Sequence, residues 1–165
     1  MRVKLQIATE DDVSDLVSLR SAVSQHMTAQ YGNGFWSSVS TEKGVLFAMR
    51  TSAVYVARHH KRLIATLTLS TRKPWAIDKK YFSASDRPLY LTGMAVGPDH
   101  QRKGLGRLCI EEASRIARKW PSDALRLDAW DAEAGAGAFY RKCGFREVGR
   151  ATYRDAPLIY FEMLL

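Results

Sequence analysis

The most constraining feature of this chain is a short glycine-containing segment at a predicted strand-to-helix junction. The segment reads Gln101-Arg102-Lys103-Gly104-Leu105-Gly106-Arg107. Glycine lets backbone approach a ligand closely, and the first turn of a helix offers unpaired N–H groups and the positive end of the helix dipole. Basic side chains surround that point: Arg102, Lys103 and Arg107. The segment therefore predicts a site for an anion such as a pyrophosphate.

This segment does not match the better-known phosphate motifs. The P-loop pattern G-x-x-x-x-G-K-[ST] is absent, and Cys109 stands where the dinucleotide fingerprint has its third glycine. Taken alone, Q-x-x-G-x-G is equally compatible with a plain turn whose basic side chains are solvated. Its meaning therefore depends on the rest of the chain.

Hydrophobic periodicity places the segment in an α/β chain. Predicted strands cover residues 3–7, 53–58, 62–70, 89–96, 125–130, 145–152 and 157–164, and predicted helices cover residues 13–27, 41–50, 105–120 and 133–143. The order is β-α-α-β-β-β-α-β-α-β-β. No repeat or Pro/Gly-rich linker interrupts the 165 residues. We expect a single domain over residues 1–165.

The positive charge does not point to a nucleic-acid-binding protein. The chain has 25 Lys and Arg and 17 Asp and Glu, a net charge of +8. The excess is spread over both halves, and no zinc-finger spacing, basic region with heptads or aromatic single-strand motif accompanies it. An anionic small ligand accounts for the charge equally well.

Further classes of protein are disfavoured by what the sequence lacks. It has no apolar run of the ~18 residues that a membrane-spanning helix needs, and no apolar stretch typical of a signal peptide, so a cytoplasmic location is expected. Cys109 and Cys143 form no C-x-x-C pair. We therefore expect neither a disulfide scaffold nor a metal site.

Two motifs in sequence order resemble those of the GNAT superfamily of acyl-CoA-dependent N-acetyltransferases. The first is Met94-Ala95-Val96 leading into Gln101-x-x-Gly104-x-Gly106. The second, about 35 residues later, is Ala136-x-x-Phe139-Tyr140-x-x-x-Gly144-Phe145. The resemblance covers residues 89–146, and the N-terminal half fits only in its order of elements.

The resemblance implies a fold and a binding site for acetyl-CoA. The fold is a mixed, mostly antiparallel sheet of about seven strands, flanked by about four helices and splayed at its central parallel pair. Backbone groups of the predicted strand would bind the pantetheine arm, and the glycine-containing loop would hold the pyrophosphate. The implied binding residues are Met94, Ala95, Val96, Arg102, Lys103, Gly104, Leu105, Gly106 and Arg107. The chain departs from the family at Glu133, where an Asn is common, because a carboxylate cannot donate an amide hydrogen bond.

The same resemblance implies two catalytic residues, each with an alternative. Tyr140 would act as a general acid, since a phenol with a pKa near 10 can protonate a departing thiolate whose thiol pKa is about 8.5; the alternative is a core aromatic beside Phe139. Asp128 would act as a base for the amine; the alternative is a salt bridge with a neighbouring arginine. Asp78, in a loop, is a lesser candidate for the base.

The function implied is transfer of the acetyl group of acetyl-CoA to a primary amine, by direct attack in a ternary complex. Small amines and protein N-termini both remain open as acceptors, and so does a homodimer. Residues 27–40 and 71–88 would flank the acceptor cleft. Their aromatic residues are Tyr31, Phe35, Trp36, Trp75, Tyr81 and Phe82. The alternative function is a non-catalytic acyl-CoA-binding or sensor module, which loss of both Asp128 and Tyr140 would have favoured.

Overall fold

One mixed sheet organises residues 3–165, the part of the chain that the computed structural model describes. The strands are β1 (Gln6–Ile7), β2 (Ala53–His59), β3 (Arg62–Ser70), β4 (Pro88–Val96), β5 (Ala124–Trp130), β6 (Arg146–Tyr153) and β7 (Ala156–Leu164). Their spatial order is β1-β2-β3-β4-β5-β7-β6, and only β4 and β5 pair in parallel. The predicted mixed, mostly antiparallel sheet is confirmed.

The helices follow the predicted order along the chain. They are α1 (Val13–Tyr31), α2 (Glu42–Thr51), α3 (Leu105–Lys119) and α4 (Gly137–Lys142). The sequence placed the start of α4 at residue 133, four residues too early. The chain turns back on the end of β5 at Gly135, where a Cβ atom would lie only 1.9 Å from the Trp130 carbonyl oxygen. The helix therefore begins only after this turn.

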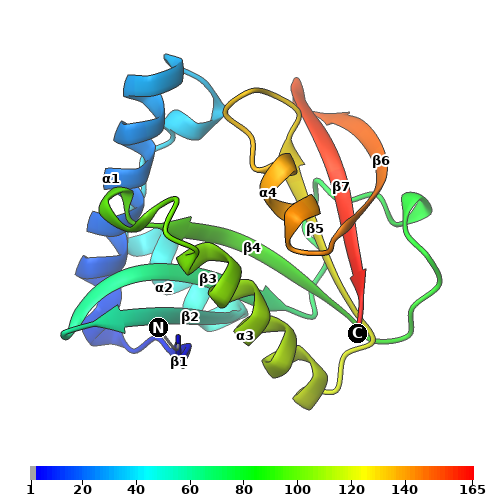
Figure 1. The fold of residues 1–165 in the computed structure, drawn as a ribbon, viewed down its shortest axis with the longest axis horizontal. Coiled ribbons are helices and arrows are strands. Elements are labelled where there is room, and N and C mark those ends of the chain that lie inside the picture. The colour runs from blue at the N-terminus through cyan, green and yellow to red at the C-terminus, as the bar shows by residue number, and fades with distance from the viewer. Residues whose placement is uncertain (1–2) are drawn as a thin grey trace.

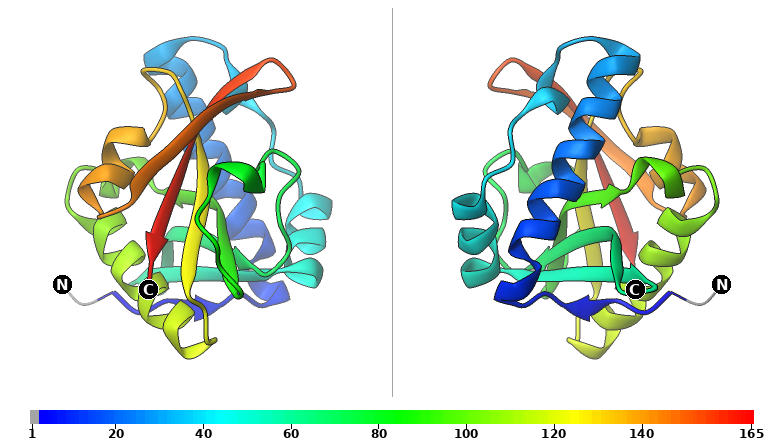
Figure 2. Two further views of the ribbon diagram at one scale, coloured as in Figure 1. Left: turned by 90° about the vertical axis from the view of Figure 1, so that its right-hand side faces the viewer. Right: turned by 90° about the vertical axis from the view of Figure 1, so that its left-hand side faces the viewer.

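The helices cover both faces of the sheet. Figure 2 shows the sheet between α3 on one side and α1 and α2 on the other. An apolar stripe on α3, formed by Leu105, Cys109, Ala113 and Ala117, packs into the main core together with Tyr140 of α4. On the opposite face, α1 and α2 form a second core with β2. Burial of these two faces fixes the register of the strands between them.

The sheet opens at its central parallel pair. Only three residue pairs join β4 to β5: Pro88 with Ala124, Leu89 with Leu125, and Tyr90 with Arg126. Figure 1 shows the two strands side by side near the C-terminus and diverging away from it. Beyond Tyr90, the edge of β4 that faces β5 has no strand partner. The predicted splay is therefore confirmed, and it leaves backbone N–H and C=O groups free for another partner.

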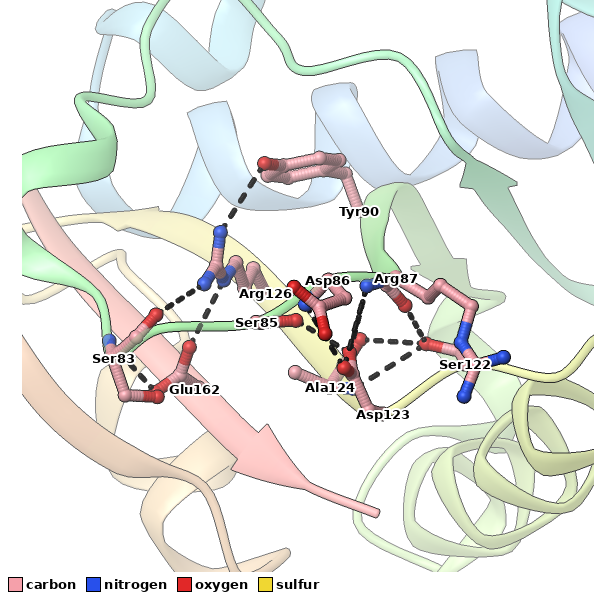
Figure 3. Close-up of polar contacts among 10 residues, drawn as sticks. All are labelled: Ser83, Ser85, Asp86, Arg87, Tyr90, Ser122, Asp123, Ala124, Arg126 and Glu162. Atoms are coloured by element: carbon pink, nitrogen blue, oxygen red, sulfur yellow. Dashed lines mark hydrogen bonds and ion pairs between the residues drawn. The ribbon is translucent and has the colours of Figure 1, made fainter.

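A buried polar cluster holds the two strands together where they meet (Figure 3). The Arg126 side chain donates from Nε to a Glu162 carboxylate oxygen of β7 at 2.9 Å and from Nη2 to the Ser83 carbonyl at 2.6 Å. Its Nη1 lies 3.4 Å from the Tyr90 hydroxyl of β4. Beside it, Asp123 accepts backbone N–H bonds from the segment that leads into β4. The cluster thus ties the loop before β4 to β5 and β7.

Breaking this cluster should destabilise the fold strongly. The Arg126 and Glu162 side chains are 4% and 1% exposed, so Arg126→Met leaves a buried carboxylate without its counter-ion. We expect a loss of about 3 to 5 kcal/mol in the free energy of unfolding, measured in urea. Adding Glu162→Leu to Arg126→Met should recover part of that loss. As a control, Asp131→Asn removes one partner of an exposed ion pair with Arg150 and should cost less than about 1 kcal/mol. Equal losses for the buried and exposed pairs would contradict this account.

Candidate functional site

The free edge of β4 carries a bulge that shapes the candidate site. The pairing with β3 skips one residue of β4 between Thr92 and Ala95. Gly93, within this bulge, has a φ of +57°, a conformation that glycine adopts without strain. The bulge bends the strand and changes the direction of its backbone groups immediately before Met94–Val96. The segment expected to bind pantetheine therefore starts at a bend beside the opening of the sheet.

The glycine-containing loop lies between β4 and α3, as predicted. Gly104 has a φ of +81° at the start of α3, and a Cβ atom there would meet nothing within 4 Å. Arg102 also adopts a positive φ, +56°. The Gln101 amide donates to the Val96 carbonyl at 2.9 Å and anchors the loop to the end of β4. The exposed N-terminus of α3 thus faces open space next to the free strand edge.

The basic residues of the loop differ in what they contact. The Lys103 ammonium donates to the Asp99 carbonyl at 2.7 Å. Arg107 forms an exposed ion pair with Glu111 at 3.0 Å, one helical turn along. Arg102 is exposed and makes no hydrogen bond to the described residues. Glu133, the departure from the family pattern, is exposed too. An anion at the N-terminus of α3 would therefore meet Arg102 without displacing an existing partner.

Gly106 lies against an aromatic side chain of α4. A Cβ atom at Gly106 would be 3.1 Å from two ring carbons of Phe139. The absence of a side chain thus lets the first turn of α3 pack closely on α4. The sequence motif attributed this glycine to the ligand, and the structure adds a packing role to it.

Tyr140, on α4, is 7% exposed and belongs to the main core. Its ring packs near Phe139, Phe145 and Phe161. Its hydroxyl contacts the Met94 sulfur of β4 at 3.9 Å, and a thioether is only a weak acceptor. Burial, and then the charge of Asp128, raise the pKa of Tyr140 well above its ordinary value. The phenol is thus protonated and directed at the strand expected to bind pantetheine.

Asp128 lies on β5, beyond the point where the two central strands separate. Among residues 3–165 it forms no ion pair, because Arg126, its neighbour on the same face, pairs with Glu162 instead. Burial raises the pKa of Asp128 above its ordinary value of 3.8. The arginine salt bridge considered for this residue is not formed. A carboxylate with a raised pKa and no counter-ion is suited to accept a proton.

A cavity of about 430 Å³ opens on the other side of the β4 bulge. It lies between α1, the segment from Trp36 to Val45, residues 93–95 of β4 and Trp130 of β5. The Trp36 and Trp130 rings meet edge to face with centroids 5.9 Å apart. The cavity therefore borders both central strands where they diverge.

Few of the aromatic residues that the sequence predicted to flank the acceptor cleft line this cavity. Of the six aromatic residues expected there, Trp36 does so. Tyr81 and Phe82 instead pack on Tyr160, and Trp75 is 85% exposed. Sequence reasoning missed Arg20, which also lines the cavity. A signal for it existed: Arg20 interrupts the apolar helical stripe of Leu16, Val23 and Met27.

The cysteines are poorly suited to carry an acetyl group. Burial raises the pKa of Cys109 to about 11 and also raises that of Cys143. Both thiols are therefore almost fully protonated near neutral pH, whereas the thiolate is the nucleophile. Within residues 3–165, no group of three or more His, Cys, Asp and Glu side chains is placed to hold a metal ion.

Known proteins share this sequence pattern and this architecture. The family model described as "Acetyltransferase (GNAT) family" matches residues 21–145. A glucosamine 6-phosphate N-acetyltransferase from Schizosaccharomyces pombe is 31% identical over 91 residues, which cover 55% of this chain and 72% of that protein.

Solved structures have the same fold. The ribosomal-protein-S18-alanine N-acetyltransferase from Escherichia coli superposes with a TM-score of 0.70 at 17% identity, covering 98% of this chain and 93% of that one. The PaiA N-acetyltransferase from Thermoplasma acidophilum, crystallised with coenzyme A, gives 0.69 at 16% identity, covering 97% and 98%.

The chain belongs to the GNAT acetyltransferase family. It is an acyl-CoA-dependent N-acetyltransferase, an enzyme that moves an acetyl group from acetyl-CoA to an amine. No helix in the described part of the chain combines the length and hydrophobicity needed to cross a bilayer.

A matched pair of glycine substitutions tests the loop. Gly104 and Gly32 both have positive φ values, +81° and +79°, and both face open space. Gly104 has a ψ of −4°, in the left-handed helical region, whereas Gly32 has a ψ of −177°, a combination that is essentially restricted to glycine. Gly104→Ala should therefore cost about 1 to 2 kcal/mol of stability, and Gly32→Ala at least as much. Only Gly104→Ala should weaken CoA binding, by about tenfold, because its Cβ blocks approach to the backbone. Calorimetric titration with CoA beside a melting curve measures both effects. Unchanged CoA affinity in folded Gly104→Ala would remove Gly104 from the binding site.

Proposed function

We propose that acetyl-CoA binds in the opening between β4 and β5 and that the amine attacks it directly from the cavity at the β4 bulge. The observation that carries this proposal is the free edge of β4, which lies between the glycine-containing loop and the cavity. The glycine-containing loop lies at the end of the strand, and the cavity lies against residues 93–95. Backbone groups of Met94, Ala95 and Val96 would bind the pantetheine arm. Residues Arg102, Lys103, Gly104, Leu105, Gly106 and Arg107 would surround the pyrophosphate.

The proposed chemistry needs one proton acceptor and one proton donor. The amine nitrogen attacks the thioester carbonyl carbon and forms the new C–N bond, and Asp128 accepts the proton that the nitrogen loses. The C–S bond then breaks, and Tyr140 donates its phenolic proton to the departing thiolate. The products are the N-acetylated amine and CoA.

Asp128 and Tyr140 would act as an electrostatically coupled pair. The negative charge of Asp128 contributes to the raised pKa of Tyr140. When Asp128 takes the proton of the amine, that charge disappears and the pKa of Tyr140 falls. Proton uptake at the base thus promotes proton release at the acid at the moment the thiolate leaves. The high thiol pKa of both cysteines supports direct transfer without an acyl-enzyme.

We further propose that the acceptor is a small primary amine. A cavity of about 430 Å³ falls in the size range of small-molecule sites. The Schizosaccharomyces pombe relative is named for glucosamine 6-phosphate, which makes this aminosugar phosphate a first compound to try. The single domain and the cytoplasmic location remain part of the proposal. The absence of nucleic-acid binding remains a prediction, and the oligomeric state remains open.

Tyr140→Phe tests the proposed acid by removing one oxygen and keeping the ring. We expect kcat and kcat/KM to fall together by about 10²-fold, equivalent to about 2.7 kcal/mol, because the proton is donated only as the C–S bond breaks. The assay measures the release of free thiol from acetyl-CoA in the presence of an amine that the wild-type enzyme acetylates, and a melting curve confirms that the variant is folded. Tyr55→Phe is the matched control, since Tyr55 is also a buried tyrosine but belongs to β2. Wild-type kcat in folded Tyr140→Phe would assign Tyr140 to the core alone.

Asp128→Asn should lower activity and raise stability. Burial raises the pKa of Asp128 in the folded protein above 3.8, so the folded state binds its proton more tightly than the unfolded state. As the pH rises from about 3.8 through the raised pKa, the ionisation of Asp128 therefore lowers the free energy of unfolding. The whole of this loss is present at neutral pH. Asp128→Asn should unfold at a higher temperature than wild type at pH 7, and the difference should vanish below pH 3.8.

The kinetic effect of Asp128→Asn follows the same titration. Wild-type kcat/KM should rise as Asp128 ionises, and the variant should lose about 10²-fold at pH values above that titration. A variant whose pH–rate profile overlays that of wild type would exclude Asp128 as the base.

A further inference from the structure

We propose that Arg20 selects acceptor amines that also carry an oxyanion, either a carboxylate or a phosphate. The inference rests on the proposed function, because it takes the cavity at the β4 bulge as the acceptor site. Arg20 belongs to α1, whose blue ribbon runs along the sheet in Figure 1. It is the only charged residue among the described residues that line the cavity.

Arg20 is charged but has no counter-ion in the described part of the chain. None of the ion pairs there includes it. Its Nε is the only buried side-chain nitrogen or oxygen of residues 3–165 that has no hydrogen-bond partner. The Arg20 side chain is half-buried, so its guanidinium remains protonated, and a buried N–H without a partner is costly to the folded state. Such a group is typical of a binding site whose partner arrives with the ligand.

The backbone of β4 places this guanidinium beside the reaction site. A Cβ atom at Gly93 would lie 3.4 Å from Nη2 of Arg20, so the guanidinium rests against the bulge. The next three residues are those proposed to bind pantetheine. An oxyanion on Arg20 would therefore lie close to the thioester, and the amine that attacks must be only a few bonds from it.

The rest of the cavity fits a small, partly apolar body attached to that anion. Trp36 and Trp130 form one side, and Val23 and Met27 of α1 lie beside Arg20. Arginine can bind a carboxylate or a phosphate through two parallel N–H bonds. An amino acid with an apolar side chain, or a small aminoalkyl phosphate, has the required amine, anion and size.

The test compares acceptors that differ only in the anion. Phenylalanine is paired with phenethylamine, and O-phosphoethanolamine with ethanolamine, in a thiol-release assay at saturating acetyl-CoA. We expect wild type to use at least one anionic member more efficiently than its neutral partner, and the two pairs separate carboxylate from phosphate. Arg20→Met should lower kcat/KM for the anionic acceptor by about 10²-fold, mainly through KM. It should leave the neutral partner within about twofold, and Arg20→Lys should restore part of the preference.

Two controls separate recognition from structure. Arg118→Met removes the same charge from the exposed end of α3 and should leave the anion preference unchanged. Arg20→Met should unfold at the same temperature as wild type or higher, because it removes an unpartnered buried N–H. A lower unfolding temperature for Arg20→Met would assign Arg20 a structural role and overturn the inference.

The kinetic outcomes distinguish this inference from the proposed function. Equal use of anionic and neutral acceptors by wild type would overturn the role of Arg20 and leave acetyl transfer in the cavity intact. Equal losses of kcat/KM for the anionic and the neutral acceptor in Arg20→Met would also overturn the role of Arg20, since they would indicate weaker use of acetyl-CoA. Thiol release with none of the four amines would count against the small-amine acceptor itself, and the inference would fall with it.

Discussion

A buried arginine holds the two halves of the sheet together where β4 and β5 pair. Arg126 of β5 binds Glu162 of β7, a carbonyl in the loop before β4 and the hydroxyl of Tyr90 on β4. Because only three residue pairs join the parallel strands, this cluster marks the point from which they diverge. Everything beyond it, including the free edge of β4, the bulge and the cavity, depends on that fixed end.

Charge is divided between the two sides of the opening. The loop at the start of α3 presents exposed basic side chains, whose attraction for an anion weakens as salt increases. The cavity contains a single, half-buried arginine, and electrostatic interactions are stronger for a partly buried charge than for an exposed one. Asp128 on β5 and Tyr140 on α4 belong to neither region, and burial raises the pKa values of both. In the proposed function, the exposed loop thus binds the large anion CoA weakly, and Arg20 discriminates among small anionic acceptors.

The sequence was sufficient for the element order, the mixed sheet and its splay, because strand and helix periodicities and two spaced motifs are local signals. It was less sufficient for the acceptor side. Aromatic composition suggested six wall residues, yet of these only Trp36 lines the cavity, since tertiary packing places Tyr81 and Phe82 against Tyr160. Arg20 was overlooked because its isolation depends on which residues surround it in space. The roles of Asp128 and Tyr140 remain predictions.

The close packing at Gly106 connects the two ends of the proposed reaction. Gly106 belongs to the turn expected to receive the pyrophosphate, and the ring it contacts is Phe139, the residue before Tyr140. A Cβ atom added there would lie 3.1 Å from the Phe139 ring, so that ring would have to move by a few tenths of an ångström. If that movement reached Tyr140, a substitution in the turn proposed to hold the pyrophosphate would slow the proposed proton transfer with little change in CoA affinity. In this chain, a kinetic defect does not by itself reveal which of the two regions was altered.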